Sequence, residues 1–294
     1  MFRSVLSLFT ETFQQWNRHK APKMGAALAY YAVLSLAPLV ILALSLLSLL
    51  VQRDAARAEV VGQFSSLVGQ QGGAMVDTIL ASSASPKAGV IGTIVGFGVL
   101  LIGASGAFGE LQDSLNQIWA VPVADRPWTA MIKDRLLSFA MVFVIGFLLL
   151  VSLVLSAGIA AAAKFFREYL PASGGLWELT NSGLSFFVVT ILFALIFRVL
   201  PDTRIAWRDV WVGAGITALL FTVGKFLIGL YLGQAAVASS YGAAGSLIII
   251  LLWTFYSAQI LFFGAEFTQV FARRHGTHQA PPLPAHRAPV ANRS

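Results

Sequence analysis

Residues 243–271 read AAGSLIIILLWTFYSAQILFFGAEFTQVF and contain a single charged residue, Glu266. This run is longer than the roughly 20 apolar residues that a helix needs to cross about 30 Å of hydrocarbon. Inside lipid the backbone has to satisfy its own hydrogen bonds, and a helix does so within one segment. We therefore predict that this stretch is a transmembrane helix.

Comparable apolar segments recur along the chain, which is 57% hydrophobic and only 11% charged and has a mean hydropathy of +0.77. Buried helices of a soluble protein would be nearer 10–14 residues long, so a membrane protein is the better interpretation. The sequence predicts an all-α fold, a polytopic membrane helix bundle of six transmembrane helices with amphipathic surface helices. The six predicted spans are Gly25–Val51, Ala88–Ala107, Ile132–Ala163, Thr180–Leu200, Trp207–Leu232 and Ala243–Phe271.

The basic residues indicate the orientation of these spans. With the N-terminus placed in the cytoplasm, fourteen of the twenty Lys and Arg residues fall in cytoplasmic segments, five fall outside, and Lys225 lies within a span. The positive-inside rule then predicts that both termini are cytoplasmic. A basic rim facing anionic lipid headgroups accounts for the net charge of +7, so we expect membrane lipids and no nucleic acid as partners.

The chain divides into three regions by composition. Residues 1–20 are predicted to form an amphipathic interfacial helix, 21–275 the six-span transmembrane domain, and 276–294 a disordered, proline-rich cytoplasmic tail. Residues 1–20 lack the continuous apolar core of a signal peptide, so we expect the first span to act as an uncleaved anchor. The absence of cysteine excludes disulfides and thiolate chemistry.

Two segments outside the spans have a helical period. Near the N-terminus, Phe2, Leu6, Phe9, Phe13 and Trp16 fall on one face, which is typical of a helix lying flat on a membrane surface. Such a helix is either an anchor or a lateral gate that senses lipid. The external segment, about residues 52–87, predicts two short amphipathic helices separated at Gly72-Gly73.

Small residues and proline predict where the spans pack and bend. Proline removes a backbone donor, so Pro38 predicts a helix kink near Ser35. Two GxxxG pairs allow close approach of neighbouring helices, although in the second span the glycines are also compatible with a mobile helix lining a cavity. These helix-packing candidates are Gly92 with Gly96 and Gly229 with Gly233.

Residues suited to catalysis are scarce. His275 and His278 are three residues apart without a third ligand nearby, whereas zinc sites use three or four. The chain has no HExxH, GxSxG or GxxxxGK[ST] pattern, the signatures of metalloproteases, esterases and ATP-driven pumps. We therefore expect no enzyme activity, no metal and no cofactor.

Ionisable residues inside spans are the strongest functional candidates, because a charge in hydrocarbon is costly. Lys225 is expected near the external side and Glu266 near the cytoplasmic side, either as anchors or as the two mouths of a polar pathway. Glu266 is expected to bond to a basic residue (Arg198, Arg204, Arg208 or Lys23) or to a backbone donor. Tyr256, Gln259 and Glu266 share one helical face, and the substrate-path candidates are Lys225, Glu266, Tyr256, Gln259, Tyr30 and Ser35.

Four separated stretches together resemble the YihY / virulence factor BrkB family: KMGAALAYYAVLSLAPL, SLNQIW, LPDTRIAWRDVWVGAGITALLF and YGAAGSLIIILLWTFYSAQILFFGAEF. The resemblance covers roughly residues 15–273 and implies a multi-pass protein of the bacterial inner membrane. The family was once labelled a tRNA-processing ribonuclease, a label regarded as mistaken. Nuclease chemistry needs clustered metal ligands, and this sequence has none.

The residues and the resemblance together favour a transporter or flippase-like protein for an amphipathic or lipidic substrate. A few polar groups in an apolar cavity suit a molecule with a polar head and an apolar body. The alternative is a non-transporting membrane scaffold that recruits envelope proteins through its surface helices and tail. The sequence does not specify the substrate, the direction and energy source of transport, or the oligomeric state.

Overall fold

The computed structural model describes residues 2–48, 51–83, 90–122, 174–234 and 245–275. Every element of regular secondary structure in these ranges is an α-helix, as predicted. The helices are α1 (Phe2–Arg18), α2 (Ala21–Leu47), α3 (Arg53–Val68), α4 (Gln70–Ser83), α5 (Val90–Ile118), α7 (Gly174–Val199), α8 (Trp207–Gln234) and α10 (Gly245–Arg274).

Four described helices are long and apolar enough to cross a membrane. They correspond to the first, fourth, fifth and sixth predicted spans. From residue 90 onward the second predicted span, Ala88–Ala107, lies in α5. The third, Ile132–Ala163, lies outside the described residues, as does the tail 276–294. The all-α membrane character is thus confirmed, and the count of six spans stays a prediction. The four helices contain the segments Ala21–Ser45, Ser182–Val199, Trp207–Gly229 and Gly245–Arg274.

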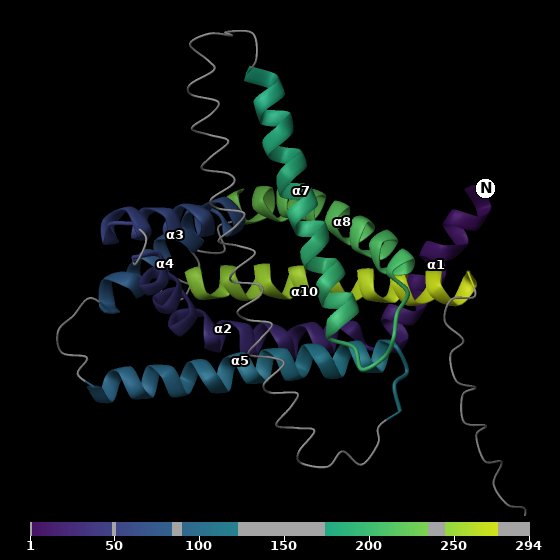
Figure 1. Ribbon diagram of the computed structural model, residues 1–294, viewed down its shortest axis with the longest axis horizontal. Coiled ribbons are helices and arrows are strands. Elements are labelled where there is room, and N and C mark those ends of the chain that lie inside the picture. The colour runs from purple at the N-terminus through teal and green to yellow at the C-terminus, as the bar shows by residue number, and fades with distance from the viewer. Residues whose placement is uncertain (1, 49–50, 84–89, 123–173, 235–244, 276–294) are drawn as a thin grey trace, which may run out of the picture.

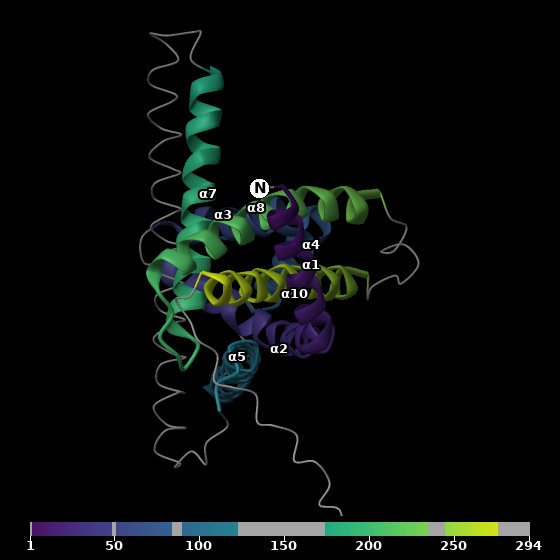
Figure 2. The ribbon, with the colours of Figure 1, turned by 90° about the vertical axis from the view of Figure 1, so that its right-hand side faces the viewer.

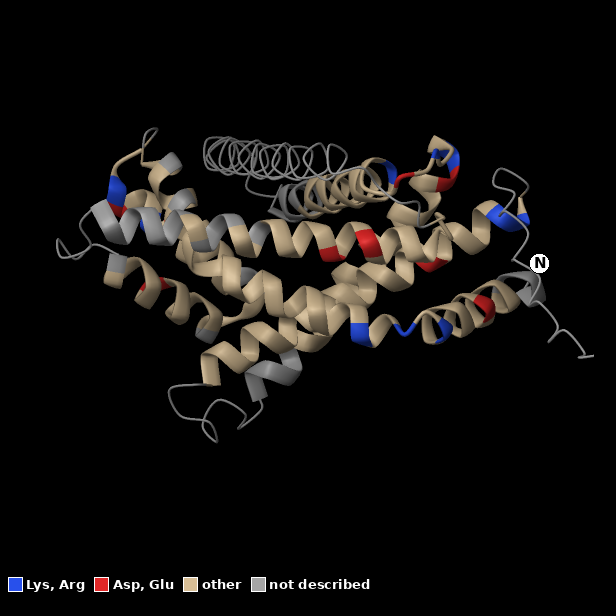
Figure 3. Cartoon of the chain, turned by 90° about the horizontal axis from the view of Figure 1, so that it is seen from below, with Lys and Arg blue, Asp and Glu red and all other residues tan. Residues whose placement is uncertain are grey.

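Helix α10 is central to the arrangement. It lies between α8 on one side and α2 on the other, and α5 covers the far side of α2 (Figures 1 and 2). Helix α7 crosses this layer steeply and packs against α8. Most of the described ribbon is uncharged, and its few charged residues are separated by long uncharged stretches (Figure 3). This distribution is the one that a lipid-embedded bundle requires, because charges avoid hydrocarbon.

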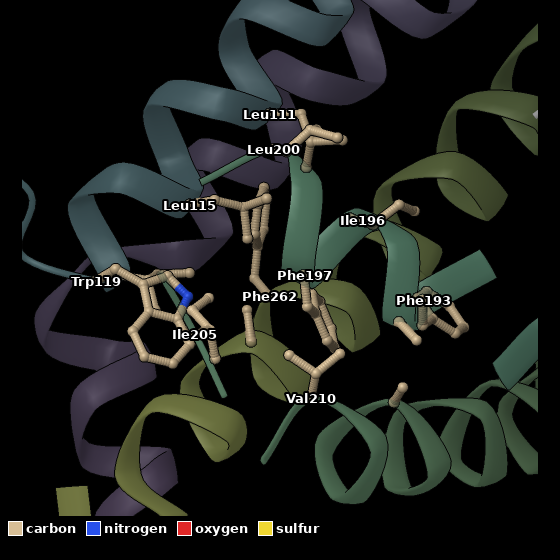
Figure 4. Packing of buried hydrophobic residues seen from close by; sticks show 14 of the residues in the cluster. Leu111, Leu115, Trp119, Phe193, Ile196, Phe197, Leu200, Ile205, Val210 and Phe262 are labelled. Carbon is tan, nitrogen blue, oxygen red and sulfur yellow. The ribbon is translucent and has the colours of Figure 1, made fainter. Parts of the chain in front are cut away.

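The largest apolar core lies at one end of the bundle, which we call the basic end. It comprises the residues around the start of α2, the end of α5, the α7–α8 turn and the end of α10. Leu115 from α5, Trp119 just after it, Phe197 from α7 and Phe262 from α10 are almost completely buried there (Figure 4). Five helices therefore share a single core at this end, and their relative positions are fixed by it.

The contact between α8 and α10 is an interlock of glycine and threonine. Gly213 of α8 faces Thr268 of α10. Four residues later on α8 and four residues earlier on α10, Thr217 faces Gly264. A Cβ on either glycine would lie only 2.8 Å from the Cβ of the facing threonine. Each threonine hydroxyl donates 2.7 Å to the carbonyl four residues earlier in its own helix, so no polar group is left unmet.

A similar close approach joins α2 to α5. A Cβ on Gly103 of α5 would lie 2.9 Å from the backbone nitrogen of Ser35 in α2. Helix α2 continues through Pro38, and Ser35 Oγ donates to the carbonyl of Ala32 at 3.0 Å. Close packing by glycine was expected instead at the two GxxxG pairs. A Cβ on Gly229 would meet no atom of the described residues within 4 Å, and Gly92, Gly96 and Gly233 lie in helices whose side chains there are not described.

The external segment forms two helices, but the predicted position of the break between them is wrong. The break is at Gly69, whose φ of +92° favours glycine. Gly72 and Gly73 lie inside α4 instead, where a Cβ would collide with Val68 and Ser65 of α3. Their role is to let the two helices pack closely, and an ion pair between Arg57 Nε and Asp77 Oδ1, 2.7 Å long, joins the same helices.

Helix α1 packs on α10 with part of the apolar face seen in the sequence. The ring of Phe9 lies 5.4 Å from that of Phe267 of α10, and Leu8 and Thr12 beside it are buried. Leu6 and Phe13 of the same apolar face are 61% and 57% exposed. The helix is present where it was predicted, and part of its apolar face is left exposed by the described residues. That exposure is what an interfacial helix needs, since such a face inserts among lipid headgroups.

The α8–α10 interlock predicts opposite effects for two substitutions on one helix. Gly213→Ala places a methyl group against Thr268 and should lower the free energy of unfolding by about 1–3 kcal/mol. Gly215→Ala, two residues away, meets no described atom within 4 Å and should be neutral or stabilising by about 1 kcal/mol through helix propensity. Unfolding in mild detergent measures both, and equal effects would contradict the interlock.

Candidate functional site

The polar residues predicted to share a face of α10 are buried within the bundle. Glu266 has no exposed surface, and both polar atoms of the Gln259 side chain are buried. They are seven residues apart, about 10.5 Å along the helix axis. Tyr256 is partly buried, and a Cβ on Gly224 of α8 would lie 2.6 Å from its hydroxyl. The stripe faces neighbouring helices along its length, as expected.

The partner of Glu266 is a histidine, so the predicted pairing with an arginine, Lys23 or a backbone donor is wrong. Its carboxylate Oε1 lies 2.6 Å from His19 Nδ1. The physical reason is the position of the α1–α2 turn, which brings His19 onto α10, while the arginines at the end of α10 bond elsewhere. The second oxygen, Oε2, is buried and has no hydrogen-bond partner among the described residues.

Gln259 lies deeper in the bundle, against α2. Its side-chain amide packs on Gly25, where a Cβ would lie 3.2 Å from Gln259 Cδ. In the described part of the chain neither Nε2 nor Oε1 has a hydrogen-bond partner, although both are buried. An unmet buried polar group costs about 1–3 kcal/mol. The α2–α10 contact therefore holds a donor and an acceptor that the described protein does not satisfy.

The remaining substrate-path candidates are dispersed. Lys225 is exposed on α8, toward the end of the helix remote from Glu266. Tyr30 is 59% exposed on α2 and packs edge-on against Tyr31, with 5.4 Å between ring centroids. Ser35 is buried in the α2–α5 contact. The structure thus groups Gln259 with Glu266 and does not place Lys225, Tyr30 or Ser35 beside them.

A second polar cluster joins α5 to the turn between α7 and α8. Asn116 Nδ2 donates to Asp202 Oδ2 at 2.7 Å, and Asn116 Oδ1 accepts from the Asp202 backbone N–H at 2.8 Å. Gln112 Nε2 lies 3.3 Å from both carboxylate oxygens of Asp202. The α7–α8 turn is thereby fixed to α5 at the basic end.

Arginines complete the polar contacts of the basic end. Arg198 donates to the carbonyl of Ile205 within the α7–α8 turn and lies over the ring of Trp207, 5.5 Å from its centroid. Arg273 and Arg274 both pair with Glu11 of α1. These contacts close the turn and attach α1 to α10, which explains why neither arginine of α10 is the hydrogen-bond partner of Glu266.

Sequence reasoning missed His19 as a partner, and it missed Asp202 and the α8–α10 interlock. The signal for the interlock was present, because Gly213-x-x-x-Thr217 and Gly264-x-x-x-Thr268 are equivalent small-residue motifs on two spans. Asn116 and Asp202 fall within two of the stretches that carried the family resemblance. Within the described ranges, no group of three or more His, Cys, Asp or Glu residues is arranged to hold a metal ion.

The fold and these contacts define a helical, polytopic integral membrane protein. The sequence model of the virulence factor BrkB family matches residues 12–288, so the chain belongs to this family. No solved structure is significantly similar to it.

The curated relatives are named as UPF0761 membrane proteins or as a putative ribonuclease-like protein. A UPF0761 membrane protein from Alkalilimnicola ehrlichii is 26% identical over 88% of this chain and 57% of its own length. The putative ribonuclease-like protein YfkH from Bacillus subtilis is 24% identical over 92% and 96%. A UPF0761 membrane protein from Mannheimia succiniciproducens is 27% identical over 90% and 88%. The chain thus spans little more than half of the first relative and most of the other two.

The Asn116–Asp202 contact predicts a rescue by exchange. Asn116→Asp replaces the donor with a second carboxylate facing Asp202 and should lower the free energy of unfolding by about 1–3 kcal/mol. Adding Asp202→Asn restores a donor that faces the carboxylate of residue 116. The backbone N–H of residue 202 and the side-chain amide of Gln112 still have oxygen acceptors, so most of the lost free energy of unfolding should be recovered. Unfolding of the single and double variants in detergent measures this, and a double variant no better than the first would contradict the contact.

Proposed function

We propose that this integral membrane protein of the BrkB family is a transporter or flippase-like protein for an amphipathic or lipidic substrate. The observation that carries the proposal is the pair of buried residues on α10, Gln259 and Glu266. Together they hold three polar atoms without a hydrogen-bond partner among the described residues. Natural proteins satisfy nearly all such atoms, and the exceptions call for an explanation such as a ligand.

The chemistry of these atoms suits a polar headgroup. Gln259 offers a donor and an acceptor, and Glu266 offers one carboxylate oxygen, at two levels along the same helix face. The surroundings are apolar or glycine, including Gly25 and Phe262. A headgroup would make hydrogen bonds in steps along α10, while acyl chains remain in the bilayer. Lys225 would act at the external mouth, where a long cationic side chain reaches headgroups.

Stability and activity are expected to change in opposite directions at Gln259. Gln259→Met keeps the length of the side chain and removes two unmet polar atoms, so the free energy of unfolding should rise by about 1 kcal/mol or stay unchanged. Headgroup exchange in proteoliposomes should fall by about tenfold, because a buried hydrogen-bonding partner for the headgroup is worth about that much.

The same exchange assay includes Glu266→Gln and Lys225→Ala, with Thr254→Val as the matched control on α10. Within the described residues, the Thr254 hydroxyl donates to the carbonyl of Ile250 in its own helix, so its loss should leave exchange unchanged. If the wild type gives no exchange while a known scramblase is active in the same vesicles, the proposal is wrong. If Gln259→Met lowers the free energy of unfolding, the Gln259 side chain serves the fold and not the substrate.

A further inference from the structure

His19 lies where four helices meet. It occupies the short turn between α1 and α2, and the next residue, Lys20, has a left-handed φ of +56°. Its side chain contacts Glu266 of α10, and its backbone carbonyl accepts from Gln117 Nε2 of α5 at 3.4 Å. These two contacts of His19 therefore join the α1–α2 turn to α10 and to α5.

The charge of this pair is balanced in only one protonation state. When the pair holds one proton, the imidazolium and the carboxylate neutralise each other or the proton is shared at 2.6 Å. Loss of the proton leaves a negative charge on a carboxylate with no exposed surface, and burial makes such a charge costly. The His19 side chain is 25% exposed, so the proton has a route to water.

Other charged groups near the pair act differently. Besides His19, the group that acts on the charge of Glu266 is Arg273, seven residues or about two turns further along α10. Burial, followed by repulsion from Asp113, raises the pKa of the Glu110 carboxyl on α5. The charged residues on the elements packed around Glu266 at this end are Glu11 and Arg18 on α1, Lys20 in the turn, Lys23 on α2, Glu110 and Asp113 on α5, Arg208 and Asp209 on α8 and Arg273 and Arg274 on α10.

We infer that His19 and Glu266 form a proton-binding site, and that release of its proton detaches the α1–α2 turn from α10. Among the described residues, this contact is the side-chain hydrogen bond between the turn itself and α10. Glu11 attaches α1 to Arg273 and Arg274 two turns earlier, and Ala21 and Met24 pack just after the turn in the core shared with α10. The link from this proton to substrate movement rests on the proposed function. The proton site itself does not, and it can be tested without a substrate.

Cysteine labelling measures the detachment directly, because the chain has no cysteine of its own. Met24→Cys places a thiol in the core next to the turn, at a position that is 7% exposed. Gln14→Cys, on the exposed side of α1, supplies the reference that cancels the pH dependence of thiol chemistry. The full chain in lipid nanodiscs is labelled between about pH 6 and 9, a range that spans the titration of histidine.

The ratio of the two labelling rates should be lowest near neutral pH and rise about tenfold or more toward pH 9, as the unbalanced carboxylate opens the turn. Glu266→Gln should abolish this alkaline rise, because the carboxamide and neutral imidazole carry no charge. His275→Gln is the matched control, since His275 is exposed at the end of α10 and its hydrogen bond within the described residues is to the carbonyl of Phe271. This variant should keep the rise.

A flat wild-type ratio, or a rise that persists in Glu266→Gln, would overturn the inference. If Glu266→Gln does not fold, His19→Gln replaces it: the carboxylate then lacks its counter-charge, and labelling should be fast at every pH above about 6 without a neutral minimum. If His19→Gln shows the same dependence of the labelling ratio on pH as the wild type, the inference is also overturned.

Headgroup exchange under an imposed pH gradient separates this inference from the proposed function. Exchange that responds to the gradient in the wild type and not in Glu266→Gln supports coupling of the proton to transport. Exchange that ignores the gradient, with the labelling profile intact, overturns the coupling and leaves the proton site. Absence of exchange in every vesicle that carries the protein would refute the proposed function alone.

Discussion

Helices in lipid gain no hydrophobic free energy by packing together, so their association depends on how closely their backbones approach. In this protein α10 meets that condition through α8, where Gly213 and Gly264 each receive a threonine of the other helix. Helix α10 also contacts α1, α2, α3, α4 and α5, and its contact with α2 is about as extensive as that with α8. A side chain added at either glycine would therefore displace the helix that carries both Gln259 and Glu266.

Polar contacts and apolar core coincide at the basic end, and this explains why the site is there. The buried aromatic residues of α5, α7 and α10 exclude water, which strengthens hydrogen bonds such as those of Asn116 with Asp202. The same exclusion raises the cost of every polar atom left unmet, including those of Gln259. The end of the bundle with the largest apolar core is thus also the end where an unsatisfied donor or acceptor costs the most free energy.

Much of the fold could be predicted from the sequence, because span length and charge placement are local properties. Four predicted spans correspond to described helices with span-like composition, and helices are present in residues 1–20 and 52–87, where the sequence predicted them; their interfacial and external locations stay predictions. Contacts between distant segments could not be predicted: the partner of Glu266 is 247 residues away, and no periodicity specifies which basic residue a turn brings near it. The position of the external break was misassigned because Gly69 and Gly72 give the same signal, and only φ and packing distinguish them.

The attachment of α1 to α10 has a consequence for how the protein is made. Of the described helices, α1 leaves the ribosome first, whereas Glu266, Arg273 and Arg274, the partners of His19 and Glu11, are among the last described residues to be synthesised. Leu8 and Thr12 therefore lack the surface of α10 until that helix has been made. The contacts that join the first described helix to the last one can form only late in synthesis.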